Sequence, residues 1–91
     1  MVSGMSSLDL SDAAGKGRAT LGVIADGGPV LTLMDAMEND RVFLDVEPNG
    51  RPRLELYDAK VKKRARLSLS SDGSPSMKLY DAAENTIWKA P

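Results

Sequence analysis

Apolar and polar residues alternate along most of this chain with a period of two. Leu54-Glu55-Leu56 and Ala65-Arg66-Leu67-Ser68-Leu69 are two such runs. A period of two places successive side chains on opposite faces of a β-strand, and no stretch has the spacing of an amphipathic helix. The pattern therefore predicts an all-β protein made of half-buried strands.

The alternation is itself repeated every 23 residues, because blocks that start at Ser7, Val30, Arg53 and Ser76 align without gaps. Three columns of this alignment are Leu8, Leu31, Leu54 and Met77; Leu10, Leu33, Leu56 and Leu79; and Asp12, Asp35, Asp58 and Asp81. Each unit reads as two strands, with an Asp-Ala turn after the first and a Gly-x-Pro turn after the second. We therefore expect an antiparallel up-and-down meander of about eight short strands from four hairpin repeats.

The meander is expected to form one domain over residues 7–91, preceded by a flexible N-terminus at residues 1–6. Loop lengths follow from parity, because residues that face each other across a hairpin point to the same side. Glu47-Pro48-Asn49-Gly50 fits a three-residue loop with Gly50 in the left-handed region, which pairs Val46 with Pro52. Ala25-Asp26-Gly27 and Ser71-Asp72-Gly73 fit the same loop.

The Asp-Ala turns are predicted to need four loop residues, because Leu10 then faces Ala19. Gly15 supplies a flexible residue in the first of them. In the second and fourth turns Asn39 and Asn85 can accept a positive φ. Val61 in the third turn resists it, so we expect that turn to bend at Lys62 or to differ from the others.

Extending this pairing across all strands gives one apolar face and one polar face. Two rows predicted to be buried are Leu8, Leu21, Leu31, Leu44, Leu54, Leu67, Met77 and Ala90; and Leu10, Ala19, Leu33, Val42, Leu56, Ala65, Leu79 and Trp88. The sequence encodes no helix to cover the apolar face. Two architectures therefore remain open: a sheet rolled up and closed as a barrel, or an open sheet packed in an oligomer.

The third copy, from Leu54 to Pro75, carries the motif Leu-x-Leu-x-Asp-Ala followed by Arg-Ala-x-Leu-x-Leu-x-x-Asp-Gly-x-Pro. This motif resembles a repeat of uncharacterised small bacterial proteins built from tandem hairpins of about 23 residues. The resemblance covers residues 7–91. It implies the repeat architecture and a bacterial source, and it brings no activity with it.

Composition argues against catalysis. The chain has no histidine and no cysteine, so the usual general base, metal ligand and soft nucleophile are all missing. We expect no enzymatic activity, no cofactor and no metal. The recurring aspartates and glycines of the turns are assigned structural roles, since Asp caps a turn and Gly accepts positive φ. These turn residues are Asp12, Asp35, Asp58, Asp81, Gly27, Gly50 and Gly73.

Charge is balanced overall, at a net −1, but it is uneven locally: seven of the twelve basic residues lie between Arg51 and Arg66. Together with nearby tyrosines they form a candidate macromolecule-binding surface. Its members are Arg53, Tyr57, Lys60, Lys62, Lys63, Arg64, Arg66, Lys78 and Tyr80. Phosphate contacts and base stacking there would suit single-stranded nucleic acid. Acidic residues crowd the preceding copy, so complementary patches suit self-association or a protein partner equally well.

The leading hypothesis is a non-enzymatic binding or assembly module that self-associates as a homo-oligomer or binds a protein partner. Two alternatives are nucleic-acid binding through the third repeat and a small-ligand-binding β-barrel. Residues 1–7 lack the basic and apolar regions of a signal peptide, and no apolar run has membrane-spanning length. We expect a cytoplasmic protein with no membrane partner.

Overall fold

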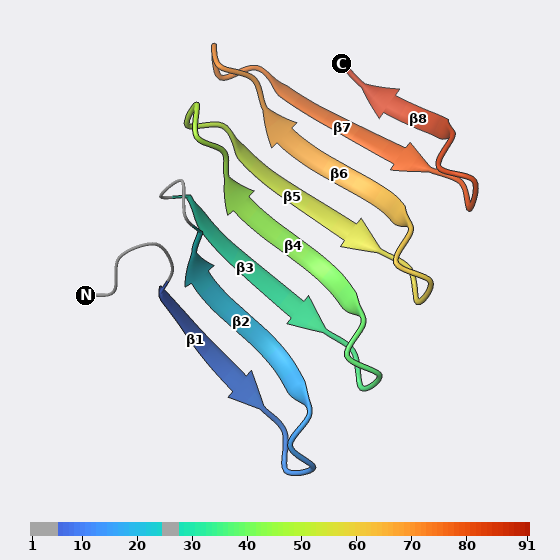
Figure 1. The fold of residues 1–91 in the computed structure, drawn as a ribbon. Helices are drawn as coiled ribbons and strands as arrows, with labels where there is room; N and C mark the ends of the chain where they lie inside the picture. The colour runs from blue at the N-terminus through green and yellow to red at the C-terminus, as the bar shows by residue number, and fades with distance from the viewer. Residues whose placement is uncertain (1–5, 25–27) are drawn as a thin grey trace.

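A computed structural model of the chain describes residues 6–24 and 28–91, and their regular structure consists of eight strands in one sheet (Figure 1). The strands are β1 Ser6–Ser11, β2 Gly17–Val23, β3 Pro29–Met34, β4 Asp40–Val46, β5 Pro52–Tyr57, β6 Lys63–Leu69, β7 Pro75–Tyr80 and β8 Thr86–Ala90. Their order in the sheet is their order in the chain, and each neighbouring pair is antiparallel. The predicted all-β meander is confirmed. Of the N-terminus expected to be flexible, only Ser6 is described, and it begins β1.

The register agrees with the parity argument. Leu44 faces Leu54 and Val46 faces Pro52 across β4 and β5. Both apolar rows run unbroken through the facing pairs from β1 to β8. The 23-residue repeat therefore places all of its apolar positions on one side of the sheet.

The Asp-Ala turns were predicted to have four loop residues, and this prediction is wrong. In the first turn Asp12 N donates to Lys16 O and Gly15 N donates to Asp12 O, so the loop has three residues. A β-bulge then sets Ser11 opposite Gly17, which leaves Arg18 as the extra residue. The same register shift follows the other three Asp-Ala turns. A three-residue loop plus one bulged residue preserves the facing pairs that a four-residue loop would give.

The third residue of each Asp-Ala loop lies in the left-handed region, whatever its side chain. Gly15 has φ 83°, and the equivalent Glu38, Val61 and Glu84 have φ 63°, 60° and 65°. The prediction that the third turn bends at Lys62 is therefore wrong. Hydrogen bonds within the loop outweigh the steric preference of the valine, which costs about 1–2 kcal/mol in this region.

The Gly-x-Pro turns have the predicted three-residue form where they are described. Gly50 N donates to Glu47 O and Gly73 N donates to Ser70 O, with φ 89° and 87° at the two glycines. The loop predicted at Ala25-Asp26-Gly27 lies outside the described residues.

The sheet is open, and β1 and β8 are its two edges (Figure 1). The closed-barrel architecture is therefore wrong. Closing eight tilted strands requires a stagger of about eight residues, and these strands are shorter than that and lie level with one another. The molecule is thin, with extents of 39 × 30 × 15 Å.

An open single layer leaves its apolar face uncovered. No apolar side chain among the described residues is buried: Leu8 is 58 % exposed, and Leu44 at the centre of the sheet is 42 % exposed. The rows predicted to be buried lie together as expected, but the described residues leave them exposed.

Candidate functional site

The apolar face is shaped into two hollows near the ends of the strands that adjoin the Gly-x-Pro turns. One, of about 310 Å³, lies over β2 to β5, and the other, of about 460 Å³, lies over β4 to β7. Leu44 and Pro52 contribute to both, so these residues form the ridge between the two hollows. Proline at the start of β3, β5 and β7 and leucine from β2, β4 and β6 recur in the lining. The 23-residue repeat therefore gives the apolar face a surface shape that repeats along the sheet.

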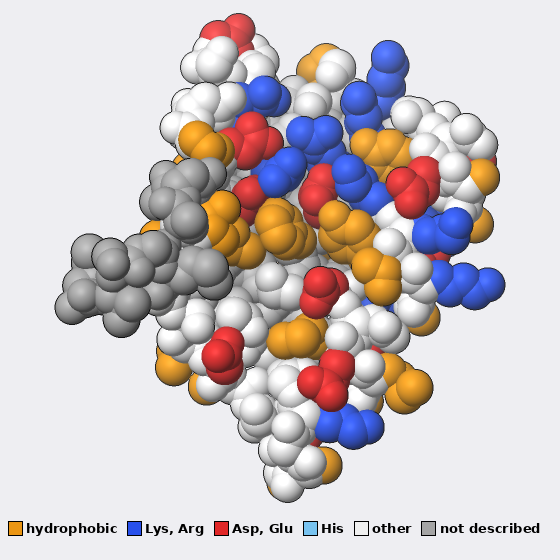
Figure 2. All heavy atoms as spheres, viewed as in Figure 1, with side chains coloured by type: hydrophobic (Ala, Val, Ile, Leu, Met, Phe, Trp, Pro, Cys, Tyr) orange, Lys and Arg blue, Asp and Glu red, His pale blue; other side chains and the backbone are white. Residues whose placement is uncertain are grey.

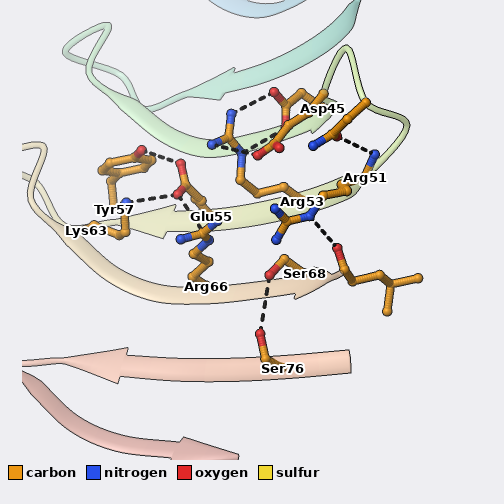
Figure 3. Close-up of polar contacts among 12 residues, drawn as sticks. Asp45, Arg51, Arg53, Glu55, Tyr57, Lys63, Arg66, Ser68 and Ser76 are labelled. Atoms are coloured by element: carbon orange, nitrogen blue, oxygen red, sulfur yellow. Dashed lines mark hydrogen bonds and ion pairs between the residues drawn. The ribbon is translucent and has the colours of Figure 1, made fainter. Parts of the chain in front are cut away.

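The opposite face carries acidic and basic side chains next to one another, with hydrophobic side chains among them (Figure 2). Its most buried side chain is Glu55, in the middle of β5, at 4 % exposure. Tyr57 Oη donates to Glu55 Oε1 at 2.8 Å, and Lys63 Nζ lies 3.0 Å from Glu55 Oε2. Arg66 Nε lies 3.9 Å from the same oxygen (Figure 3). Glu55 faces Arg66 across β5 and β6, and Tyr57, Lys63 and Arg66 lie around its carboxylate.

These contacts set the protonation of the cluster. Burial opposes the charge on Glu55, yet the Tyr57 hydroxyl and the Lys63 ammonium outweigh it and hold the pKa of Glu55 below its usual value. Burial, together with the hydrogen bond to Glu55, raises the pKa of Tyr57 to about 12. At neutral pH the cluster therefore holds an ionised carboxylate and a neutral phenol.

A second group of charges joins β4 to β5. Arg53 Nε and Nη2 donate to the two carboxylate oxygens of Asp45 at 3.0 and 2.8 Å, and Arg53 Nη1 lies 3.3 Å from Glu47 Oε1 (Figure 3). The guanidinium also lies over the Phe43 ring, 5.5 Å from its centroid. The acidic second copy thus neutralises part of the basic third copy within one molecule.

The bulged arginines act between hairpins rather than as an exposed ladder. Arg18, Arg41 and Arg64 each donate through Nε to the main-chain carbonyl oxygen of Met34, Tyr57 and Tyr80, at 3.2, 2.7 and 3.0 Å. Each also lies 3.4 to 3.5 Å from the aspartate of its own turn. The ring contact described in this structure is the one between Arg53 and Phe43.

The four turn aspartates accept main-chain hydrogen bonds in the same way. In the third turn Asp58 Oδ1 accepts from Lys60 N and Lys62 N at 2.9 and 3.0 Å. These bonds lower the pKa of Asp58, and the equivalent bonds lower it in the other three turns. The geometry is that of a capped turn, in line with the structural role assigned to these residues.

The structure divides the nine candidate surface residues into two groups. Arg53, Lys63 and Arg64 have carboxylate partners, the Tyr57 hydroxyl is bonded to Glu55, and the Tyr80 carbonyl accepts from Arg64. The other group consists of four cations that form no ion pair shorter than 3.9 Å within the described residues. Lys60 and Lys62 lie on the exposed loop between β5 and β6, whereas Arg66 and Lys78 face each other in the middle of β6 and β7.

A polar hollow of about 130 Å³ lies beside Arg66 and Lys78, and Arg51, Ser68 and Ser76 complete its lining. The sequence-based candidate surface omitted Arg51, Ser68 and Ser76. The register could have indicated them, because Ser68 faces Ser76 next to the facing pair of Arg66 and Lys78.

Among the described residues, no group of three or more acidic side chains is arranged to hold a metal ion. The same part of the chain contains no helix that could span a membrane. No protein-family model and no curated protein matches this chain.

Proposed function

We propose that this protein is a non-enzymatic assembly module that pairs with a second copy of itself through its apolar face. The observation that carries the proposal is the exposure of that face: among the described residues no apolar side chain is buried. Stable domains are built from at least two packed layers, and this chain supplies one. A second copy supplies the missing layer with a surface that is apolar in the same places.

The size of the face fits such an interface. Eight strands about 4.8 Å apart, each about 20 Å long, cover roughly 800 Å². A stable protein interface buries about 800 Å² on each partner. Two copies stacked face to face about 10 Å apart would form a sandwich, with the mean strand directions within about 30° of each other.

The shape of the apolar face supports two-fold pairing. In a two-fold interface the same patch meets itself, so a ridge on one copy must fit a hollow on the other. Leu44 and Pro52 form a ridge between two apolar hollows, which is the kind of self-complementary surface that a two-fold axis requires. The polar faces would then point outward, away from each other, where they are free to meet another macromolecule.

Gel filtration with light scattering over a dilution series tests this proposal. We expect the mass of a dimer and a melting temperature that falls on dilution, because folding and association are coupled when the monomer lacks a core. Leu44→Lys places a charge at the centre of the interface and should abolish both the dimer and the thermal transition. Thr32→Lys, on the polar face, is the matched control and should leave the dimer intact.

Two results would contradict pairing through this face. One is a monomer mass at every concentration, with a melting temperature independent of dilution. The other is a dimer that persists unchanged in Leu44→Lys, which would indicate pairing through the edge strands β1 and β8.

Nucleic-acid binding through the third repeat has less support, because carboxylates neutralise Arg53, Lys63 and Arg64 within the molecule. The small-ligand-binding barrel also has less support, because the sheet is open.

A further inference from the structure

Three cations lie directly opposite one another on the polar face. Arg66 on β6 faces Lys78 on β7, and Lys78 faces Lys89 on β8. Side chains in facing positions are about 5 Å apart at Cβ, and like charges placed there destabilise a sheet. Glu55 partly neutralises Arg66 on the β5 side, but Lys78 makes no ion pair within the described part of the chain.

The equivalent positions one repeat earlier show that the hairpin fold does not require this arrangement. Where Arg66 faces Lys78, the second and third copies place Phe43 opposite Glu55. Where Ser68 faces Ser76, those copies place Asp45 opposite Arg53, and the two side chains form a bidentate ion pair. The charged side chains Asp45 and Arg53 at the junction of β4 and β5 therefore neutralise each other. At the junction of β6 and β7, Arg66 and Lys78 face each other without a carboxylate between them.

The side chains around this positive charge have the chemistry of an anion site. Arg51, Arg66 and Lys78 line the hollow together with the hydroxyls of Ser68 and Ser76, whose oxygens are 3.4 Å apart. Arg66 Nε is buried and has no hydrogen-bond partner in the described residues. Guanidinium groups, an ammonium group and hydroxyls all donate hydrogen bonds, and no carboxylate lines the hollow.

We propose that this hollow binds a tetrahedral oxyanion, of the phosphate or sulfate class, between Arg66 and Lys78 with the hydroxyls of Ser68 and Ser76 as additional donors. The bound anion relieves the repulsion along the cation row and supplies an acceptor for Arg66 Nε. The site lies on the face opposite the apolar one, so it is accessible in a face-to-face dimer and does not depend on that pairing.

Titration of the protein with inorganic phosphate, followed by amide nitrogen–proton correlation spectra at constant ionic strength, tests the site. We expect saturable shifts centred on the amides of Arg66, Ser68, Ser76 and Lys78. Lys78→Thr, which introduces the residue found two repeats earlier at Thr32, should weaken phosphate binding about tenfold, the effect of one lost charged hydrogen bond. Lys62→Thr removes the same charge from an exposed loop and should change the affinity less than about twofold.

A second variant keeps the charge and removes only a donor. Ser76→Ala should weaken phosphate binding about threefold, with the circular dichroism spectrum unchanged. The proposal is overturned if the shifts stay linear in phosphate concentration, if Lys62→Thr and Lys78→Thr weaken binding equally, or if chloride at the same ionic strength gives the same shifts. Any of these results would mean general charge screening rather than a site.

Discussion

Arg41 Nε donates a hydrogen bond of 2.7 Å to the main-chain carbonyl oxygen of Tyr57, just beyond the point where the ladder between β4 and β5 ends at Val42 and Leu56. The bulge removes the main chain of Arg41 from the ladder, and its side chain provides the donor instead. The fourth copy has Ile87 at the equivalent position, on β8, an edge strand of the described sheet. In the described sheet, each of the three bulged arginines therefore bonds to the hairpin that follows it.

Replacing Arg41 by the isoleucine of the fourth copy should lower the free energy of unfolding by about 1 kcal/mol. The change removes a charged hydrogen bond, whose effect is discounted because the Arg41 side chain is 42 % exposed. The urea midpoint at fixed protein concentration measures the loss. Ile87→Arg is the matched control and should bring no gain. Equal midpoints for Arg41→Ile and the parent protein would show that the bond does not stabilise the sheet.

Val61→Gly should stabilise the protein by about 1 kcal/mol, because glycine accepts the left-handed conformation that valine occupies at φ 60°. The first repeat already has Gly15 at this position. The reverse change, Gly15→Val, should therefore destabilise the protein by a similar amount. Thermal unfolding of both variants checks the pair, and a lower melting temperature for Val61→Gly would contradict the strain assigned to this loop.

The sequence was sufficient to predict the strands, their order and the facing pairs, since parity leaves only one assignment that keeps Leu44, Leu54 and Leu67 on the same side. It was not sufficient to predict the Asp-Ala loops. Parity counts whether residues fall on odd or even positions, and a four-residue loop has the same parity as a three-residue loop plus a bulge. The steric preference of valine led to the wrong prediction of a bend at Lys62. The hydrogen bonds of Asp58 instead hold Val61 in the left-handed region.

The candidate site was harder to predict, because a basic segment does not reveal which of its charges are already neutralised. Arg53 and Lys63 contributed to the basic run in the sequence, but Asp45, Glu47 and Glu55 neutralise them in the sheet. Conversely, Lys78 lies outside that run, and only the register places it opposite Arg66. Charge pairing across strands therefore has to be worked out after the register is known.

Acid should destabilise the fold through the turn aspartates. Main-chain hydrogen bonds lower the pKa of Asp58 in the folded state below its ordinary value of 3.8. A lowered pKa contributes stability that is present above that ordinary value and is lost as the pH falls through the folded-state value. The melting temperature should therefore fall below about pH 4, less steeply in Asp58→Asn. A slope in Asp58→Asn equal to that of the parent protein would contradict this assignment.

Alkali should destabilise the fold through Tyr57. Its pKa rises from 10.0 to about 12 in the folded state, so its contribution is present below pH 10 and is lost as the pH rises through 12. Tyr57→Phe removes this dependence and should cost about 1 kcal/mol at neutral pH, because Glu55 loses a donor. Ultraviolet absorbance of the tyrosinate, recorded with the melting temperature, follows both effects. An unchanged alkaline dependence in Tyr57→Phe would contradict the assignment.

Glu55 links the stability of the polar face to the proposed anion site, because it is the carboxylate that shares Arg66. Glu55→Gln should lower the free energy of unfolding by about 2 kcal/mol, since Lys63 loses its ion-pair partner and Arg66 loses the carboxylate 3.9 Å from its Nε. The same change removes a negative charge beside the hollow, so phosphate should bind about fivefold more tightly, which corresponds to about 1 kcal/mol. Glu47→Gln, which affects Arg53 instead, should leave the phosphate affinity unchanged. Phosphate binding that is unaltered or weaker in Glu55→Gln would mean that Arg66 takes no part in holding the anion.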